Sequence, residues 1–284
     1  MEMIVNLLCS IMLIAGADTI VPQRAETPQE GINKDAVLVT DTISRAPSDE
    51  HCSVELLVDY PVQGKKQLVD NIRSYIANEM ESFYITHVYG DGTASPAHYE
   101  GSLDDGKALV DFHAEHILAD MKDNYQTFVD STGLKSLYMM DQSSIRKTSE
   151  NDSIVTYEAA CYQYEGGAHG QYWLEGATFS KIDGERIEIN IDPFDVNDMQ
   201  PLLREGLEKY LNDKGQGTTV EELMNGGIFL TDGIIPLPSS TPYLTAEGVK
   251  FVYGEYEIGP YVLGTPNFTI PLDKIRPFLI KDEQ

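Results

Sequence analysis

The chain has 284 residues, of which 42% are hydrophobic and 9% aromatic, so it can build one or two folded domains around real cores. Its 46 acidic and 20 basic residues give a formal net charge of −26 at pH 7. Such a charge repels nucleic-acid phosphates and attracts cationic partners, which excludes a nucleic-acid role. A second interpretation, in which the charge only keeps the protein soluble and monomeric, stays open.

The chain begins with the apolar segment MEMIVNLLCSIMLIAGA, residues 1–17, which ends in small residues. This pattern predicts a signal peptide cleaved after Ala17, although Glu2 stands where a basic residue is usual. We therefore expect an extracytoplasmic protein, periplasmic or secreted. Cys9 lies within the apolar run, so a membrane-anchored lipoprotein is an alternative if the true start differs. No later segment is apolar for long enough to predict a transmembrane helix in the mature chain.

Residues 18–35 are poor in large apolar side chains and predict a linker to the folded body. In the folded body, two runs rich in β-forming residues predict a pair of antiparallel strands, at 36–43 and 53–60. Apolar residues at helical spacing then predict helices at 66–83 and 105–129, each packed on a sheet by one face.

The second half of the chain predicts strands first and a helix afterwards. An antiparallel meander with a tight Asp183-Gly184 turn is predicted at 136–145, 153–164, 171–182 and 186–191. A helix is predicted next, followed by short strands: 197–211, then 228–230, 243–245, 249–253 and 268–271. Because strands and helices come in blocks, we expect an α+β fold with antiparallel sheets and helices packed on them. Two consecutive subdomains are expected, at 36–148 and 149–284.

Two cysteines remain after the predicted cleavage, Cys52 and Cys161, and both lie in predicted strands. In an oxidising compartment, cysteines on neighbouring strands can come within bonding distance. Two alternatives therefore stay open, a disulfide between them or two buried free thiols.

The sequence contains no recognisable catalytic or metal-binding constellation. His113 and His116 are three residues apart on a predicted helix, but a zinc site needs further ligands and no HExxH pattern is present. These histidines are expected at the edge of a buried helix face. A GxSxG elbow and a catalytic-cysteine signature are also absent, so we expect a non-enzymatic protein without a cofactor.

A glycine-rich turn, Gly166, Gly167, His169 and Gly170, separates two predicted strands. Three glycines so close together indicate a sharp bend or a close approach of the backbone to something else. His169 could donate to an anion or act as a base, or it could cap the turn or pack under the neighbouring strand while the glycines only satisfy backbone geometry. The turn lacks a following helix and lysine, which excludes a phosphate loop.

Aromatic residues provide the remaining candidates for binding. Trp173, the sole tryptophan, lies in a tyrosine-rich strand that could pack in the core or present an aromatic face to a glycan or protein. Residues 248–271 predict a strand, a rigid bend punctuated by glycine and proline, and a final short strand. Tyr256 and Tyr261 lie in that bend.

The GGAHG turn, the following Asp-Gly turn and the segment FVYGEYEIGPYVLGTPNFTIP together resemble a known family. Residues 153–279 are similar to the C-terminal extracytoplasmic domain of RsiV-type anti-sigma factors, which also occurs in PdaC-type peptidoglycan deacetylases outside their catalytic domain. Residues 36–145 resemble, in layout alone, the smaller domain that usually precedes it. The resemblance implies an α+β fold, a cell-envelope setting and, in the anti-sigma members, lysozyme binding. No sigma-binding segment or deacetylase domain is recognised, so those activities are not implied.

Three hypotheses for the function follow. The first is an envelope binding module whose acidic surface captures a cationic protein such as lysozyme. The alternative is a module that recognises peptidoglycan or another glycan through the aromatic strands near Trp173. A hydrolase that uses His169 would need a nucleophile or carboxylate within hydrogen-bond reach of the imidazole.

Overall fold

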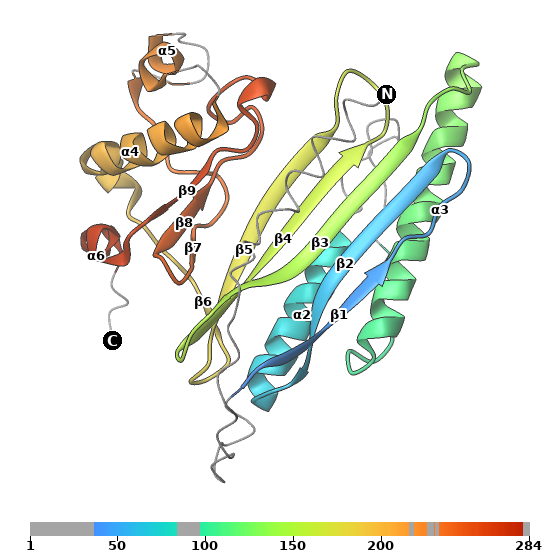
Figure 1. Ribbon diagram of the computed structural model, residues 1–284, viewed down its shortest axis with the longest axis horizontal. Helices are drawn as coiled ribbons and strands as arrows, with labels where there is room; N and C mark the ends of the chain where they lie inside the picture. Colours follow the sequence, from blue (N-terminus) through green and yellow to red (C-terminus); the bar gives the residue numbers. More distant parts are fainter. Residues whose placement is uncertain (1–36, 84–96, 216–218, 226–229, 231–232, 281–284) are drawn as a thin grey trace, which may run out of the picture. The chain divides into compact units, whose positions relative to one another are not determined.

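The computed structural model describes residues 37–83, 97–215, 219–225, 230 and 233–280. The expected signal peptide and linker lie outside these residues, as does most of the strand expected at 228–230. The described part has a six-stranded sheet, a three-stranded antiparallel sheet and helices, which confirms the predicted α+β class (Figure 1).

The six strands of the large sheet lie side by side in chain order. They are β1 (Val39–Arg45), β2 (Cys52–Gln63), β3 (Met139–Glu150), β4 (Ile154–Tyr164), β5 (Gln171–Ser180) and β6 (Arg186–Ile187). The predicted antiparallel pair β1–β2 and the predicted meander β3–β6 are both confirmed. One pair differs from the expectation of antiparallel sheets, because β2 and β3 run parallel.

The connection between β2 and β3 explains the parallel pair. It contains the two predicted helices, α2 (Lys66–Ser82) and α3 (Gly106–Thr132). The first residues of α3 lie beside Tyr60, near the end of β2, and its later turns lie near the start of β2, where Tyr125 stacks on His51. The chain therefore re-enters the sheet at the end where β2 began, and β3 must run in the same direction.

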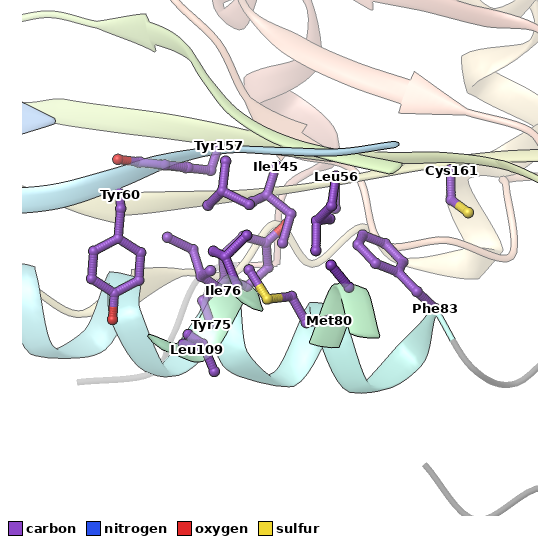
Figure 2. Close-up of a cluster of buried hydrophobic side chains, with 14 of the residues drawn as sticks. Leu56, Tyr60, Tyr75, Ile76, Met80, Phe83, Leu109, Ile145, Tyr157 and Cys161 are labelled. Carbon is purple, nitrogen blue, oxygen red and sulfur yellow. The ribbon is translucent and has the colours of Figure 1, made fainter. Parts of the chain in front are cut away.

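The main core lies between this sheet and the two helices, as Figure 2 shows for α2. Helix α2 contributes apolar residues at helical spacing, including Leu68, Ile72, Ile76 and Met80. Helix α3 ends at Gly133, whose φ of 72° is the left-handed conformation that glycine adopts readily at a helix end.

The rest of the chain has a second core. Its elements are η2 (Pro193–Asp195), α4 (Val196–Lys214), α5 (Val220–Asn225), β7 (Tyr243–Leu244), β8 (Val249–Val252), η4 (Tyr261–Leu263), β9 (Asn267–Ile270), α6 (Leu272–Ile275) and η5 (Arg276–Phe278). Helix α4 confirms the helix predicted at 197–211, and its Gly206 allows the ring of Phe268 to approach closely.

The described residues form two buried clusters, which divide after β6. A division after residue 148 would cut through β3, while β4 and β5 continue the same sheet beyond it. The first buried cluster includes Phe179, and the second begins at Ile189. The sheet thus takes in the whole meander, and the second core begins after β6.

Polar contacts join β7 to β4 and β5. The hydroxyls of Thr156 and Thr178 donate to the carbonyl oxygen of Leu244 at 2.7 and 2.6 Å. The hydroxyl of Tyr243 donates to the carboxylate of Glu158 at 2.9 Å. Both threonines are fully buried, so these bonds hold the second core against the large sheet.

Cys52 and Cys161 are buried free thiols in this structure. Strand β3 lies between their two strands, with Cys52 paired to Met139 and Cys161 paired to Ser143. Bonding the two sulfurs would require β3 to move aside.

Within the described ranges, no helix combines the length and apolarity of a membrane-spanning segment.

Candidate functional site

The glycine-rich turn between β4 and β5 requires its glycines. Gly166 and Gly167 have φ values of 98° and 102°, a backbone conformation that residues with a Cβ rarely adopt. A Cβ on Gly170 would lie 2.4 Å from the ring of Tyr162. The sharp bend and the close approach that the sequence indicates are both present, and together they place His169.

A second loop, between β8 and β9, supplies two tyrosines. Tyr256 has a φ of 63° and is the only described residue other than glycine with a positive φ. Such a conformation costs about 1 kcal/mol or more and persists only where the surroundings enforce it. The side chain of Tyr256 is half exposed, and Tyr261 begins the short helix η4.

His169 joins the two loops. Its ring stacks on Tyr261 with centroids 3.7 Å apart and planes 19° from parallel. Its Nε2 lies 3.0 Å from the Tyr256 hydroxyl, and its Nδ1 lies 2.8 Å from the Gly170 carbonyl oxygen. Because a carbonyl oxygen can only accept, Nδ1 carries the proton and Nε2 accepts from Tyr256. We call His169, Tyr256 and Tyr261 the His169 cluster.

Glu255 places a carboxylate beside this cluster. Burial raises its pKa, while the backbone N–H of Tyr172 and, when its ring is protonated, the charge of His169 lower it. The sequence analysis missed Glu255 because one acidic residue among 46 carries no signal by itself. Its place between Gly254 and Tyr256, in a segment already singled out, was the available clue.

An adjoining cleft of about 270 Å³ lies between the edge of β5 and the same loop. It is lined by Trp173, Leu174, Glu175, Ser239, Ser240, Val252, Gly254, Glu257 and Thr265. Trp173 also packs against Phe83, with ring centroids 6.1 Å apart, so it contributes to the core and to the cleft. The structure thus brings the glycine-rich turn, His169, Tyr256 and Tyr261 together and places Trp173 in the cleft.

The hydrogen-bond partners of His169 bear on the hydrolase hypothesis. The hydrogen bonds given by the described residues engage both ring nitrogens of His169 with a backbone carbonyl and a phenol. Neither partner is a serine, cysteine or carboxylate, as the hydrolase hypothesis would need. The arrangement holds His169 against two tyrosines.

The two histidines of α3, His113 and His116, lie in different environments. His113 is buried, and burial is the main cause that lowers its pKa to about 4. His116 is exposed, and its Nδ1 lies 2.8 Å from the carbonyl oxygen of Phe112. In the part of the chain that the structure describes, no group of three or more potential ligands could hold a metal ion.

A buried carboxylate that the sequence analysis missed lies in the core. Asp141 is 1% exposed and accepts hydrogen bonds from the Ser143 hydroxyl and the Gln163 side-chain amide, both at 2.6 Å. Burial is the main cause that raises its pKa to about 6, against an ordinary value of 3.8.

Residues 194–273 match DUF3298, a family described as a protein of unknown function. We call this matched part of the chain, which is similar to that family, the DUF3298 domain. The domain contains Tyr256 and Tyr261 but not His169, so the His169 cluster joins the DUF3298 domain to the glycine-rich turn of the large sheet. No curated protein matches the sequence.

Two crystal structures share the fold beyond the DUF3298 domain. A member of the DUF3298 family from Bacteroides fragilis has 19% identity and a TM-score of 0.57, over 88% of this chain and 96% of the other. A DUF3298 family protein from Pseudomonas aeruginosa has 14% identity and a TM-score of 0.53, over 87% of this chain and 97% of the other. The expected resemblance is thus supported at the level of DUF3298, and the closer likeness to RsiV-type proteins stays a prediction.

Proposed function

We propose that this protein is an exported, non-enzymatic binding module of the cell envelope that captures a cationic protein, with lysozyme as the concrete candidate. The observation that carries the proposal is the His169 cluster, in which His169 holds two tyrosines beside the carboxylate of Glu255. Binding surfaces use such preorganised aromatic anchors because ordering them on binding costs little conformational entropy.

Exposure supports a role of this loop in recognition. Tyr256 is 50% exposed and Val262 is 71% exposed, although both lie in a loop fixed by the stack of Tyr261 on His169. Large apolar side chains that are held rigid in contact with solvent are typical anchors at protein interfaces.

Charge supports a cationic partner. The net charge of −26 steers basic proteins toward the surface from several ångströms away, and the attraction weakens as salt rises. At the cluster itself, a guanidinium group could stack on a tyrosine ring and pair with Glu255.

The test is a calorimetric titration of the purified protein with lysozyme at low and at moderate ionic strength. Cytochrome c, an unrelated basic protein, serves as the control. We expect saturable lysozyme binding that weakens with salt, and weaker binding of the control. Equal affinity for both proteins would reduce the effect to general acidity and contradict the proposal.

A second candidate is recognition of peptidoglycan, which the same aromatic surface favours, because exposed tyrosine rings can stack against the apolar faces of sugars. A pull-down on purified sacculi separates the two functions. Retention on sacculi that is insensitive to salt and to added basic protein would favour the glycan.

Export rests on residues 1–17. Cell fractionation with mass analysis of the mature N-terminus tests it. A mature chain that begins at Asp18 outside the cytoplasm is expected, and an uncut chain in the cytosol would contradict export.

A further inference from the structure

On one wall of the cleft beside the His169 cluster, the hydrogen-bond donors are already paired with acceptors of the protein. The carboxylate of Glu257 accepts from the N–H and hydroxyl of Ser239, at 2.6 and 2.9 Å, and from the N–H of Gly254 at 2.6 Å. The hydroxyl of Ser240 donates to the carbonyl oxygen of Val252 at 2.6 Å. These bonds fix the Glu257 carboxylate at the cleft and leave it further lone pairs with which to accept.

The opposite wall is a stretch of the β5 edge that no described strand covers beyond Thr178. Strand β6 pairs only with Thr178 and Phe179 of β5. The N–H of Ser180 donates to Glu185, away from β4, so alternate residues of β5 direct their backbone groups to this same edge. Leu174 is one of these residues and lines the cleft, where a carbonyl oxygen on this edge would be a further acceptor.

Thr265 gives an independent sign that a ligand belongs here. It lines the cleft and is only 6% exposed, yet its hydroxyl has no hydrogen-bond partner among the described residues. Buried hydroxyls are normally satisfied, and a ligand that donates at this position would satisfy this one. Glu175, at the exposed rim, adds a second carboxylate.

We infer that this cleft receives the side chain of an arginine or lysine from the cationic partner, an inference that rests on the proposed function. A guanidinium or ammonium group donates and never accepts, which complements a site rich in acceptors. Two carboxylates favour a positive charge over a neutral sugar hydroxyl and disfavour any anion. Trp173 lines the same cleft, and its indole adds an aromatic surface of the kind that attracts cations.

Trp173 is the only tryptophan of the chain, so its fluorescence reports directly on the cleft. The experiment titrates the purified protein with N-acetyl-arginine amide, and separately with the citrulline analogue, which has nearly the same shape but no charge. We expect a saturable change in the fluorescence with the arginine compound only. No saturable change, or the same change with citrulline, would overturn the inference.

Variants test whether the fluorescence change comes from binding in the cleft. Glu257→Gln should weaken binding of the arginine compound about tenfold, because it removes the charge from a hydrogen-bonded partner. Thr265→Val, which keeps the shape, should also weaken it. Glu247→Gln makes the same charge change at an exposed turn outside the cleft and should leave the affinity unchanged. Equal affinities in all four proteins would contradict the assignment, and circular dichroism confirms that each variant is folded.

The same variants separate this inference from the proposed function. Lysozyme binding that is unchanged in Glu257→Gln would overturn the role of the cleft and leave the proposed function standing. Saturable binding of the arginine compound without any binding of a basic protein would support a cation site and overturn the proposed partner.

Discussion

His169 and Tyr261 stack with ring centroids 3.7 Å apart, although one follows β4 of the large sheet and the other lies in the DUF3298 domain. Each ring is held by its own backbone, in a glycine-rich turn and in the short helix η4. The cluster therefore forms only when both parts of the chain are folded and in contact. Binding at this surface should report on their association.

Replacing His169 tests this coupling. In His169→Ala the stack and the hydrogen bond from Tyr256 are lost, so amide hydrogens of the loop containing Tyr256 should exchange faster. An aromatic pair contributes about 1 kcal/mol, which predicts roughly fivefold weaker protection. Hydrogen exchange with mass spectrometry measures it. His116→Ala removes an exposed histidine of α3 and should leave this loop unchanged. Unaltered exchange in His169→Ala would show that the stack does not hold the loop.

Gly170 and Gly167 should respond differently to alanine. In Gly170→Ala the new Cβ meets the ring of Tyr162, and we expect overpacking to lower the free energy of unfolding by about 1–3 kcal/mol. In Gly167→Ala nothing lies within 4 Å of the new Cβ, so only backbone strain of about 1 kcal/mol is expected. Urea unfolding compares the two. A Gly170→Ala protein as stable as the wild type would mean that Tyr162 does not pack there.

Asp141 should make stability fall as pH rises. Its pKa is about 6 in the folded protein and 3.8 ordinarily, so the folded state binds more protons between these values. The contribution is fully present below pH 3.8 and lost as pH rises through 6, by about 3 kcal/mol. Asp141→Asn should remove this dependence of the free energy of unfolding on pH. It should also raise the free energy of unfolding at pH 8 relative to the wild type. Asp152→Asn, at an exposed position, is the control. If the free energy of unfolding depended on pH equally in Asp141→Asn and the wild type, a raised pKa of Asp141 would be contradicted.

The buried thiols should resist modification in the folded protein. Burial raises the pKa of Cys52 to about 11 and holds that of Cys161 well above its usual value, so neither forms the reactive thiolate near neutral pH. Alkylation followed by mass spectrometry should label both only in urea. A disulfide between them in protein isolated from cells would require a different arrangement of β2, β3 and β4.

Local patterns predicted most of the elements, and long-range relationships were harder to predict. Helix α2 and the meander follow from periodicity and turn chemistry between residues close in sequence. The parallel pair β2–β3 depends on where the end of α3 lies, and no local pattern encodes that. Nor does a local pattern indicate that the meander pairs with the preceding strands in one sheet, and the subdomain boundary at 148 stays a prediction.

The candidate site, too, was predictable in its local parts but not in how these parts meet. The glycine-rich turn and the bend containing Tyr256 were each recognisable from glycine and proline content, yet nothing in the sequence pairs one with the other. Thr265 and Asp141 gave no signal, because a single threonine or aspartate acquires its role only from burial and neighbours.

The most direct test of the central claim measures lysozyme affinity for the wild type, Tyr261→Ala and Phe194→Ala under identical salt. Tyr261→Ala removes the ring that stacks on His169, while Phe194→Ala removes a fully exposed ring outside the cluster. We predict at least about tenfold weaker binding for Tyr261→Ala, as expected for an interface anchor, and no change for Phe194→Ala. Equal affinity of all three proteins for lysozyme, or no binding by the wild type, would contradict a cation-binding surface at the His169 cluster.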